Sequence, residues 1–94
     1  MATNGHNGKA SEILTFPCTI DIKAMGKSSP RFEALVHAIV LRHIGPEDLL
    51  SCTSRESRGG NYLAITLTIR ASARAQLDAI YEALSASPNV LVAL

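Results

Sequence analysis

The segment S-R-G-G-N-Y-L-A-I-T-L-T-I-R-A, residues 57–71, constrains the fold of this chain more than any other. After a Gly-Gly-Asn turn, apolar residues occupy every second position, which is typical of a strand that is buried on one side only. The inward face would carry Leu63, Ile65, Leu67 and Ile69, and the outward face Tyr62, Ala64, Thr66, Thr68 and Arg70. The other elements must therefore cover one apolar sheet face.

Three more segments are predicted to be strands. Residues 16–25 alternate with Cys18, Ile20, Ile22 and Ala24 on one side and Thr19, Asp21, Lys23 and Met25 on the other. Residues 48–56 are β-prone but polar with weak alternation, as expected of an edge strand. Residues 90–94 form a short last strand.

Two helices are predicted between these strands. The first begins at Ser29-Pro30, with a hydroxyl cap followed by proline, and ends before Gly45-Pro46, where the glycine is expected to take a left-handed cap. The second runs from Ala73 to about Ser85, with Ser72 as its cap. Both carry an apolar stripe at helical spacing.

The order of elements predicts an α+β, ferredoxin-like βαββαβ sandwich: a four-stranded antiparallel sheet, order 4-1-3-2, with two helices on one face. Residues 16–25 and 62–71 would be the central strands. Cys18 and Cys52 would then lie two strand spacings apart, roughly 10 Å, which is too far for a disulfide.

Composition limits the function more than it defines it. We expect a disordered tail at residues 1–12 and one domain at 13–94. A net charge of +1 gives no long-range field that would attract nucleic acid or an anionic membrane, so charge does not point to either as a partner and nucleic acid is not the expected one. The lack of an apolar span or leader predicts a cytoplasmic protein with no membrane partner. His37 and His43 are six residues apart, so no metal site is expected, and no catalytic constellation or cofactor motif is present. The chain is predicted not to be an enzyme.

Several short motifs resemble the YbeD-like family of small bacterial proteins. They are Phe16-Pro17, Met25-Gly26, Arg42-His43, Arg58-Gly59 with Asn61-Tyr62, and the strand that ends Thr68-Ile69-Arg70-Ala71. The resemblance covers residues 13–94 and implies a fold like that of ACT regulatory domains. The family's biochemical function is not established, and the frequent proximity of its genes to a lipoyl-transfer enzyme's gene hints at a partner. Gly60 is an addition to the family's basic-Gly-Asn-Tyr pattern and predicts a longer loop.

The resemblance to ACT domains implies a ligand site at Gly26, Lys27, Ser28 and Ser29. In those domains a small ligand, usually an amino acid, binds beside the loop that joins the first strand to the first helix. A glycine permits close backbone approach, and a helix N-terminus offers free N–H groups to a carboxylate. The alternative is a tight turn before a capped helix.

A second candidate surface is the hairpin tip with the outward sheet face. Arg55 and Arg58 could grip an acidic group, and Asp21, Lys23 and Tyr62 lie on the outward face. The alternative is a solvated face and hairpin.

We therefore expect a non-enzymatic, ACT-like regulatory or adaptor module that acts through protein contacts, with a small effector such as an amino acid. The other hypothesis is a single-stranded RNA-binding module on the same face, although only Tyr62 could stack a base. The edge strands are candidate contacts for a homodimer.

Overall fold

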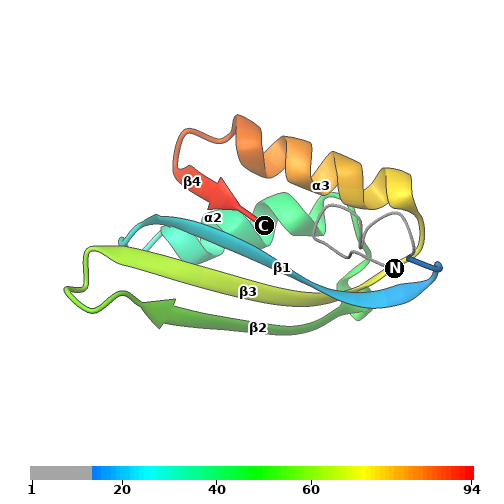
Figure 1. Ribbon diagram of the computed structural model, residues 1–94, viewed down its shortest axis with the longest axis horizontal. Coiled ribbons are helices and arrows are strands. Elements are labelled where there is room, and N and C mark those ends of the chain that lie inside the picture. Colours follow the sequence, from blue (N-terminus) through cyan, green and yellow to red (C-terminus); the bar gives the residue numbers. More distant parts are fainter. Residues whose placement is uncertain (1–13) are drawn as a thin grey trace, which may run out of the picture.

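The computed structural model describes residues 14–94, so the predicted tail at residues 1–12 lies outside the described residues. The predicted order of strands and helices is present, with one additional short 3-10 helix. The elements are β1 (Cys18–Lys27), α2 (Phe32–Leu41), η1 (Pro46–Asp48), β2 (Leu49–Glu56), β3 (Tyr62–Ala71), α3 (Arg74–Ala86) and β4 (Val90–Ala93) (Figure 1).

The four strands form one antiparallel sheet in the order β2-β3-β1-β4. This confirms the predicted order, read from the opposite edge. The central pair β1 and β3 is in continuous register, from Cys18 opposite Ala71 to Lys27 opposite Tyr62. Both helices pack on the same side of the sheet, with α2 behind it in Figure 1, so no element of residues 14–94 covers the other side.

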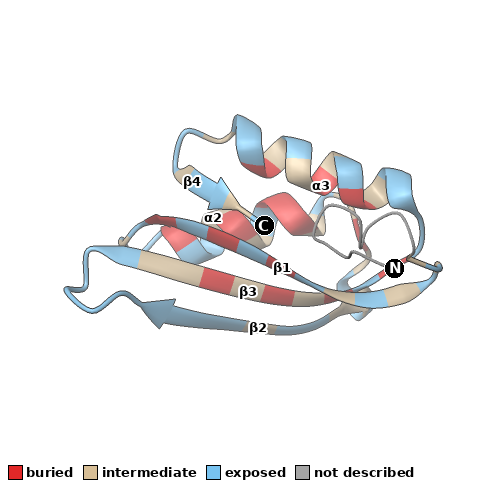
Figure 2. Cartoon of the chain, viewed as in Figure 1, coloured by how far each residue is buried: buried red, intermediate tan, exposed pale blue. Residues whose placement is uncertain are grey.

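The core lies between this sheet and the two helices. Its side chains come from alternate strand positions and from one stripe of each helix, as the two periodicities require. The central strands place Ile22, Ile65, Leu67 and Ile69 there with no exposed surface (Figure 2). Burial of each such aliphatic side chain stabilises the fold by about 1.5–3 kcal/mol.

The predicted ends of the first helix are wrong. Helix α2 begins at Phe32, and no side chain caps it; Ser29 contributes only its carbonyl oxygen, which accepts the Phe32 N–H at 3.2 Å. The helix stops at Leu41, and Gly45 is extended, with φ −73° and ψ 153°, instead of left-handed. A residue before proline avoids the helical region, so Pro46 favours this extended backbone at Gly45.

Ser72 is not the N-cap of α3. The cap position is Ala73, and it has no side-chain bond. Instead Gln76 reaches back from the first turn, and its Oε1 accepts hydrogen bonds from the Ser72 N–H at 2.7 Å and the Ser72 Oγ at 3.2 Å. The Gln76 Nε2 donates to the His43 carbonyl at 2.9 Å, which joins the start of α3 to the chain after α2.

Neither helix within residues 14–94 has the length and apolarity needed to cross a bilayer. Cys18 and Cys52 are free thiols on β1 and β2, and β3 lies between those strands.

Candidate functional site: the open sheet face

The sheet side that the helices leave uncovered is called the open face here. A hollow of about 460 Å³ lies on it where the β2–β3 hairpin meets the sheet. Three of the predicted partner-binding residues, Arg55, Arg58 and Tyr62, line it together. The rest of the lining comes from Met25, Glu56, Ser57 and Ala64.

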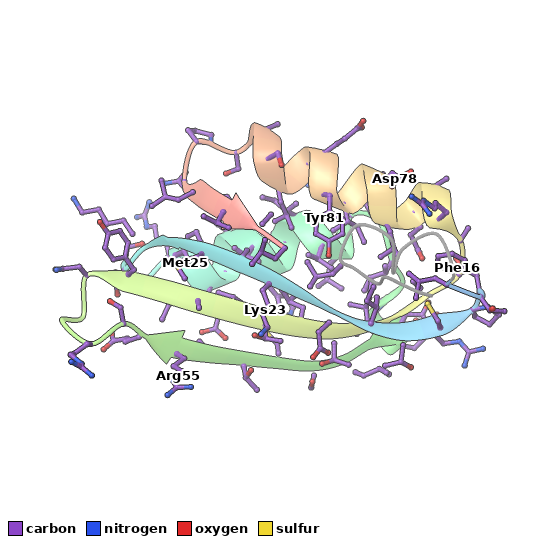
Figure 3. The ribbon with its side chains drawn as sticks, in the orientation of Figure 1. Phe16, Lys23, Met25, Arg55, Asp78 and Tyr81 are labelled. Atoms are coloured by element: carbon purple, nitrogen blue, oxygen red, sulfur yellow. The ribbon has the colours of Figure 1, made fainter. Side chains whose placement is uncertain are left out.

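Strand register explains this grouping. Arg55 on β2 is opposite Ala64 on β3, Ala64 is opposite Met25 on β1, and Met25 is opposite Val92 on β4. One row of side chains therefore crosses all four strands at neighbouring positions of one face. Figure 3 labels Met25 on β1 and Arg55 on edge strand β2.

A smaller apolar hollow of about 70 Å³ continues this row toward β4. It shares Met25 and Ala64 with the larger hollow, and its other lining residues are Lys23, Ala24, Val92 and Leu94. We call the whole row the cross-strand strip, defined as Val92, Met25, Ala64, Tyr62, Arg55 and Arg58. The exposed fractions of its large apolar side chains are 41% for Met25, 45% for Tyr62 and 44% for Val92.

Hydrogen bonds of Ser57 stabilise the hairpin tip that carries Arg58. The Ser57 Oγ accepts a hydrogen bond from the Tyr62 N–H at 3.0 Å, and the Ser57 N–H donates to the Tyr62 carbonyl at 2.8 Å. The Ser57 carbonyl accepts the Gly60 N–H at 2.9 Å, and Gly60 has φ +76°. Gly60 thus occupies a left-handed position, where a residue without Cβ is favoured.

The other two outward-face residues have separate places. The Asp21 Oδ1 accepts a hydrogen bond from the Thr68 Oγ1 across the central strand pair at 2.6 Å. Asp21 lines neither hollow of the strip, whereas Lys23 lines the smaller one. The open face thus brings Lys23 next to the apolar end of the strip and leaves Asp21 outside it.

The predicted ligand segment lies partly inside the sheet. The sequence predicts a loop at Gly26 and Lys27, but strand β1 continues to Lys27, so both residues lie in the strand. A Cβ at Gly26 would overlap the Asn89 carbonyl oxygen and lie 2.5 Å from the Phe32 Cε1, so this glycine permits close packing of its neighbours. The Ser28 N–H donates to the Asn61 carbonyl at 2.9 Å. Ser29 borders a hollow of about 260 Å³ with Arg31, Phe32, Leu35 and Asn89.

Two groups with shifted pKa values lie elsewhere. Burial, followed by the negative charge of Glu33 and a hydrogen bond to it, raises the pKa of the Cys52 thiol. The Cys52 Sγ donates to the Glu33 Oε2 at 3.8 Å, between β2 and α2. Burial raises the pKa of Tyr81. In the part of the chain that the structure describes, no three His, Cys, Asp or Glu side chains are grouped so as to hold a metal ion.

Sequence reasoning did not select Met25, Val92 or Leu94 as site residues. The alternation of residues 16–25 places Met25 on the outward face but does not single it out as a binding residue. The last strand, V-L-V-A-L, is apolar throughout, so no alternation marks Val92 and Leu94 as outward. The signal that finds them is the register of β4 on β1.

The sequence matches a described protein family over most of its length. Residues 11–94 match the family described as "Protein of unknown function (DUF493)". The chain is 43% identical over 82 residues to the UPF0250 protein of Paraburkholderia phytofirmans, which covers 87% of this chain and 92% of that protein. It is 40% identical over 90 residues to a UPF0250 protein of Bordetella pertussis, and the alignment covers 95% of this chain and 99% of that protein.

Two solved structures share the fold at low sequence identity. The solution structure of protein HP0495 from H. pylori superposes with a TM-score of 0.66 at 12% identity and covers 97% of this chain and 98% of that one. The C-terminal domain of the MgtC protein from Mycobacterium tuberculosis superposes with a TM-score of 0.65 at 18% identity, and the match covers 81% of this chain and 82% of that one. The family match and the close relatives together confirm the predicted resemblance, and this chain belongs to the DUF493 family of unknown function, which includes the UPF0250 and YbeD-like proteins.

Proposed function

We propose that this chain is a non-enzymatic, ACT-like regulatory or adaptor module that acts through protein contacts on its open face. One observation carries the proposal: Met25, Tyr62 and Val92 are each more than 40% exposed and lie side by side on a sheet face that neither α2 nor α3 covers. Scattered exposed apolar residues are ordinary, but a contiguous group with a charged rim is typical of an interaction surface. We place this role in the cytoplasm, the compartment expected from the sequence.

The lining of the larger hollow supports a role in binding instead of catalysis. No histidine lines it, and Ser57 is its only aliphatic hydroxyl. The Ser57 Oγ is already used to accept the Tyr62 N–H at 3.0 Å, and nucleophilic catalysis needs such a hydroxyl paired with a base.

The aliphatic character of the strip favours a protein over RNA as its partner. Single-stranded RNA is bound mainly by stacking of bases on aromatic rings. Tyr62 is the only aromatic residue that lines either hollow of the strip. Methionine and valine side chains suit apolar protein contacts.

A small effector such as an amino acid is the second part of the proposal. It would bind in the hollow beside Ser29 and Asn89, because the space at Gly26 itself is filled by Phe32 and the Asn89 carbonyl. The test is titration of the chain with each common amino acid while the amide chemical shifts of residues 26–31 are followed. Unchanged shifts with every amino acid would contradict this part alone.

Site-specific photo-crosslinking in the bacterial host tests the protein-contact role. A photoreactive residue replaces Met25 on the open face or, as a matched control, Glu82 on the exposed side of α3. We expect adducts with a defined protein from position 25 that are absent from position 82 and are reproduced with the two purified proteins. The lipoyl-transfer enzyme suggested by gene proximity is the first candidate for that reconstitution.

The other outcomes are distinct. Adducts that ribonuclease removes would favour the RNA-binding hypothesis, and equal adducts from both positions would contradict the proposed surface. An adduct of twice the chain's mass would indicate a homodimer. The edge strands β2 and β4 are the proposed place for pairing through backbone hydrogen bonds, and light scattering of the purified chain at several concentrations measures it.

A further inference from the structure

The cross-strand strip has two chemically different ends. Toward β4 it is mainly apolar, with Val92 opposite Met25, and Leu94 and the side chain of Lys23 border the same hollow. Toward the hairpin it is basic, with Arg55 and Arg58 around the larger hollow. Neither arginine forms a hydrogen bond or ion pair with another of residues 14–94, so both guanidinium groups remain available.

From this polarity we infer that the strip binds an acidic amphipathic helix of a partner protein, laid across the strands. The inference rests on the proposed protein-contact function and names the chemistry of the partner. The apolar turn of such a helix would cover Val92 and Met25, and its carboxylates would meet Arg55 and Arg58 as forked, charge-assisted hydrogen bonds. The partner helix would supply, on this side of the sheet, the covering layer that α2 and α3 supply on the other.

The dimensions of the strip fix the spacing of the partner's residues. From β4 to β2 there are three strand spacings, about 14 Å in total. A helix rises 1.5 Å per residue, so about nine residues span this distance. The partner segment therefore needs apolar residues at helical spacing followed, two to three turns later, by Asp or Glu on the same face.

Charge disfavours a second copy of this chain as the occupant. The basic end has three cations, Lys27 opposite Tyr62 together with Arg55 and Arg58, and one carboxylate, Glu56. Packed face to face about a two-fold axis, the two copies would place this end over another basic end or over the apolar end. Neither arrangement supplies enough carboxylates, and uncompensated like charges across an interface weaken binding.

The probe for this inference is a synthetic 16-residue helical peptide with Leu at positions 2, 5 and 6 and Glu at positions 12, 13 and 16. Amide chemical shifts of the full chain report binding. We expect shifts at Met25, Ala64 and Val92 and at Arg55 and Arg58. The same peptide with Lys in place of Glu is expected to bind at least tenfold more weakly.

Charge reversal on the chain gives the matched comparison. Arg55→Glu is expected to weaken binding of the Glu peptide at least tenfold and to strengthen binding of the Lys peptide. Arg70→Glu is the control, because Arg70 lies on the open face of β3 six residues from Ala64, about 20 Å along the strand. It makes the same charge change and is expected to alter the affinity less than twofold.

Each contrary result has a defined meaning. No shift at Met25 and Arg55 with millimolar Glu peptide would overturn the inference, as would equal affinity for the two peptides or equal effects of Arg55→Glu and Arg70→Glu. If crosslinking from position 25 still identifies a protein, the protein-contact function stands without the acidic helix. Tighter binding of a 12-nucleotide oligouridine than of the Glu peptide would overturn both.

Discussion

Gly26 is a single position at which three parts of the chain meet. It lies in β1 next to a register shift in the pairing with β4, and the Phe32 ring and the Asn89 carbonyl occupy the space of its missing side chain. A glycine that the sequence associates with ligand binding thus also has a packing role.

Gly26→Ala is expected to destabilise the fold by about 1–3 kcal/mol, because a backbone carbonyl and a core ring would have to move. Urea unfolding measures the loss. Gly59→Ala is the control, since its Cβ would only contact the Asn61 Nδ2 at 3.5 Å, and its midpoint should not fall. If Gly26→Ala unfolds at the parent's midpoint, the close approach of Phe32 and Asn89 is contradicted.

Cys52 should be alkylated by iodoacetamide with a pH midpoint above the ordinary value of a cysteine thiol, because burial and then Glu33 raise its pKa. Mass spectrometry of the Cys52 peptide measures the rate. Glu33→Gln removes the negative charge and should lower the midpoint, whereas Glu82→Gln should leave it unchanged. An unchanged midpoint in Glu33→Gln would contradict the contact between β2 and α2.

The same pKa shift predicts the direction of one contribution to stability. Above the ordinary thiol pKa, the unfolded chain releases this proton more readily than the folded chain, so the contribution of Cys52 lowers stability as pH rises there. Below that pH both states keep the proton, and Cys52 gives no pH dependence.

At the scale of elements, Gln76 joins the start of α3 to the segment that follows α2. Both ends of its amide form hydrogen bonds: the oxygen accepts the Ser72 N–H, and the nitrogen donates to the His43 carbonyl, 33 residues away in sequence. A residue inside the first turn thereby holds the chain that enters the helix, while the cap position, Ala73, has no side-chain bond.

Gln76→Ala is expected to lower the free energy of unfolding by about 0.5–1.5 kcal/mol, the net contribution of hydrogen bonds whose partners water can reach once the amide is removed. Gln76→Glu keeps an acceptor for the Ser72 N–H but cannot donate to His43, so its loss should be smaller than that of Gln76→Ala if the Ser72 bond dominates. Thermal unfolding compares the two with Glu82→Gln. A parent-like midpoint for Gln76→Ala would show that the amide makes no stabilising contacts.

At the scale of the whole molecule, the two faces of the sheet differ: one packs against both helices, and no helix of residues 14–94 covers the other. Adjacent positions on β3 show this difference. Ile65 is fully buried against the helices, whereas Ala64 lines both hollows of the open face.

Ile65→Ala is expected to cost about 2–5 kcal/mol, from lost burial and the cavity left behind, and Ile65→Val about 0.5–1.5 kcal/mol. Ala64→Ser should stay within about 0.5 kcal/mol, as a surface substitution. Urea unfolding of the three variants checks the assignment of faces. Equal losses at positions 64 and 65 would contradict the one-sided covering of the sheet.

Local sequence patterns were sufficient to predict the elements and their order in the sheet. Each pattern indicates which side of its element must be buried. The strands around Ile22 and Ile65 alternate with a period of two, and the helices carry apolar stripes at Val36 and Ile80. Because two helices must cover the same apolar side, the antiparallel order β2-β3-β1-β4 followed from them.

The helix ends, the packing at Gly26 and the composition of the cross-strand strip could be learned only from the folded chain. Each depends on contacts between residues that are distant in sequence. Gln76 bonds to His43, Gly26 packs against Asn89, and Met25 pairs with Val92. The apolar segment that ends the chain has no periodicity of its own. Which of its side chains face outward is set by hydrogen-bonded register with β1, which is a property of the assembled sheet.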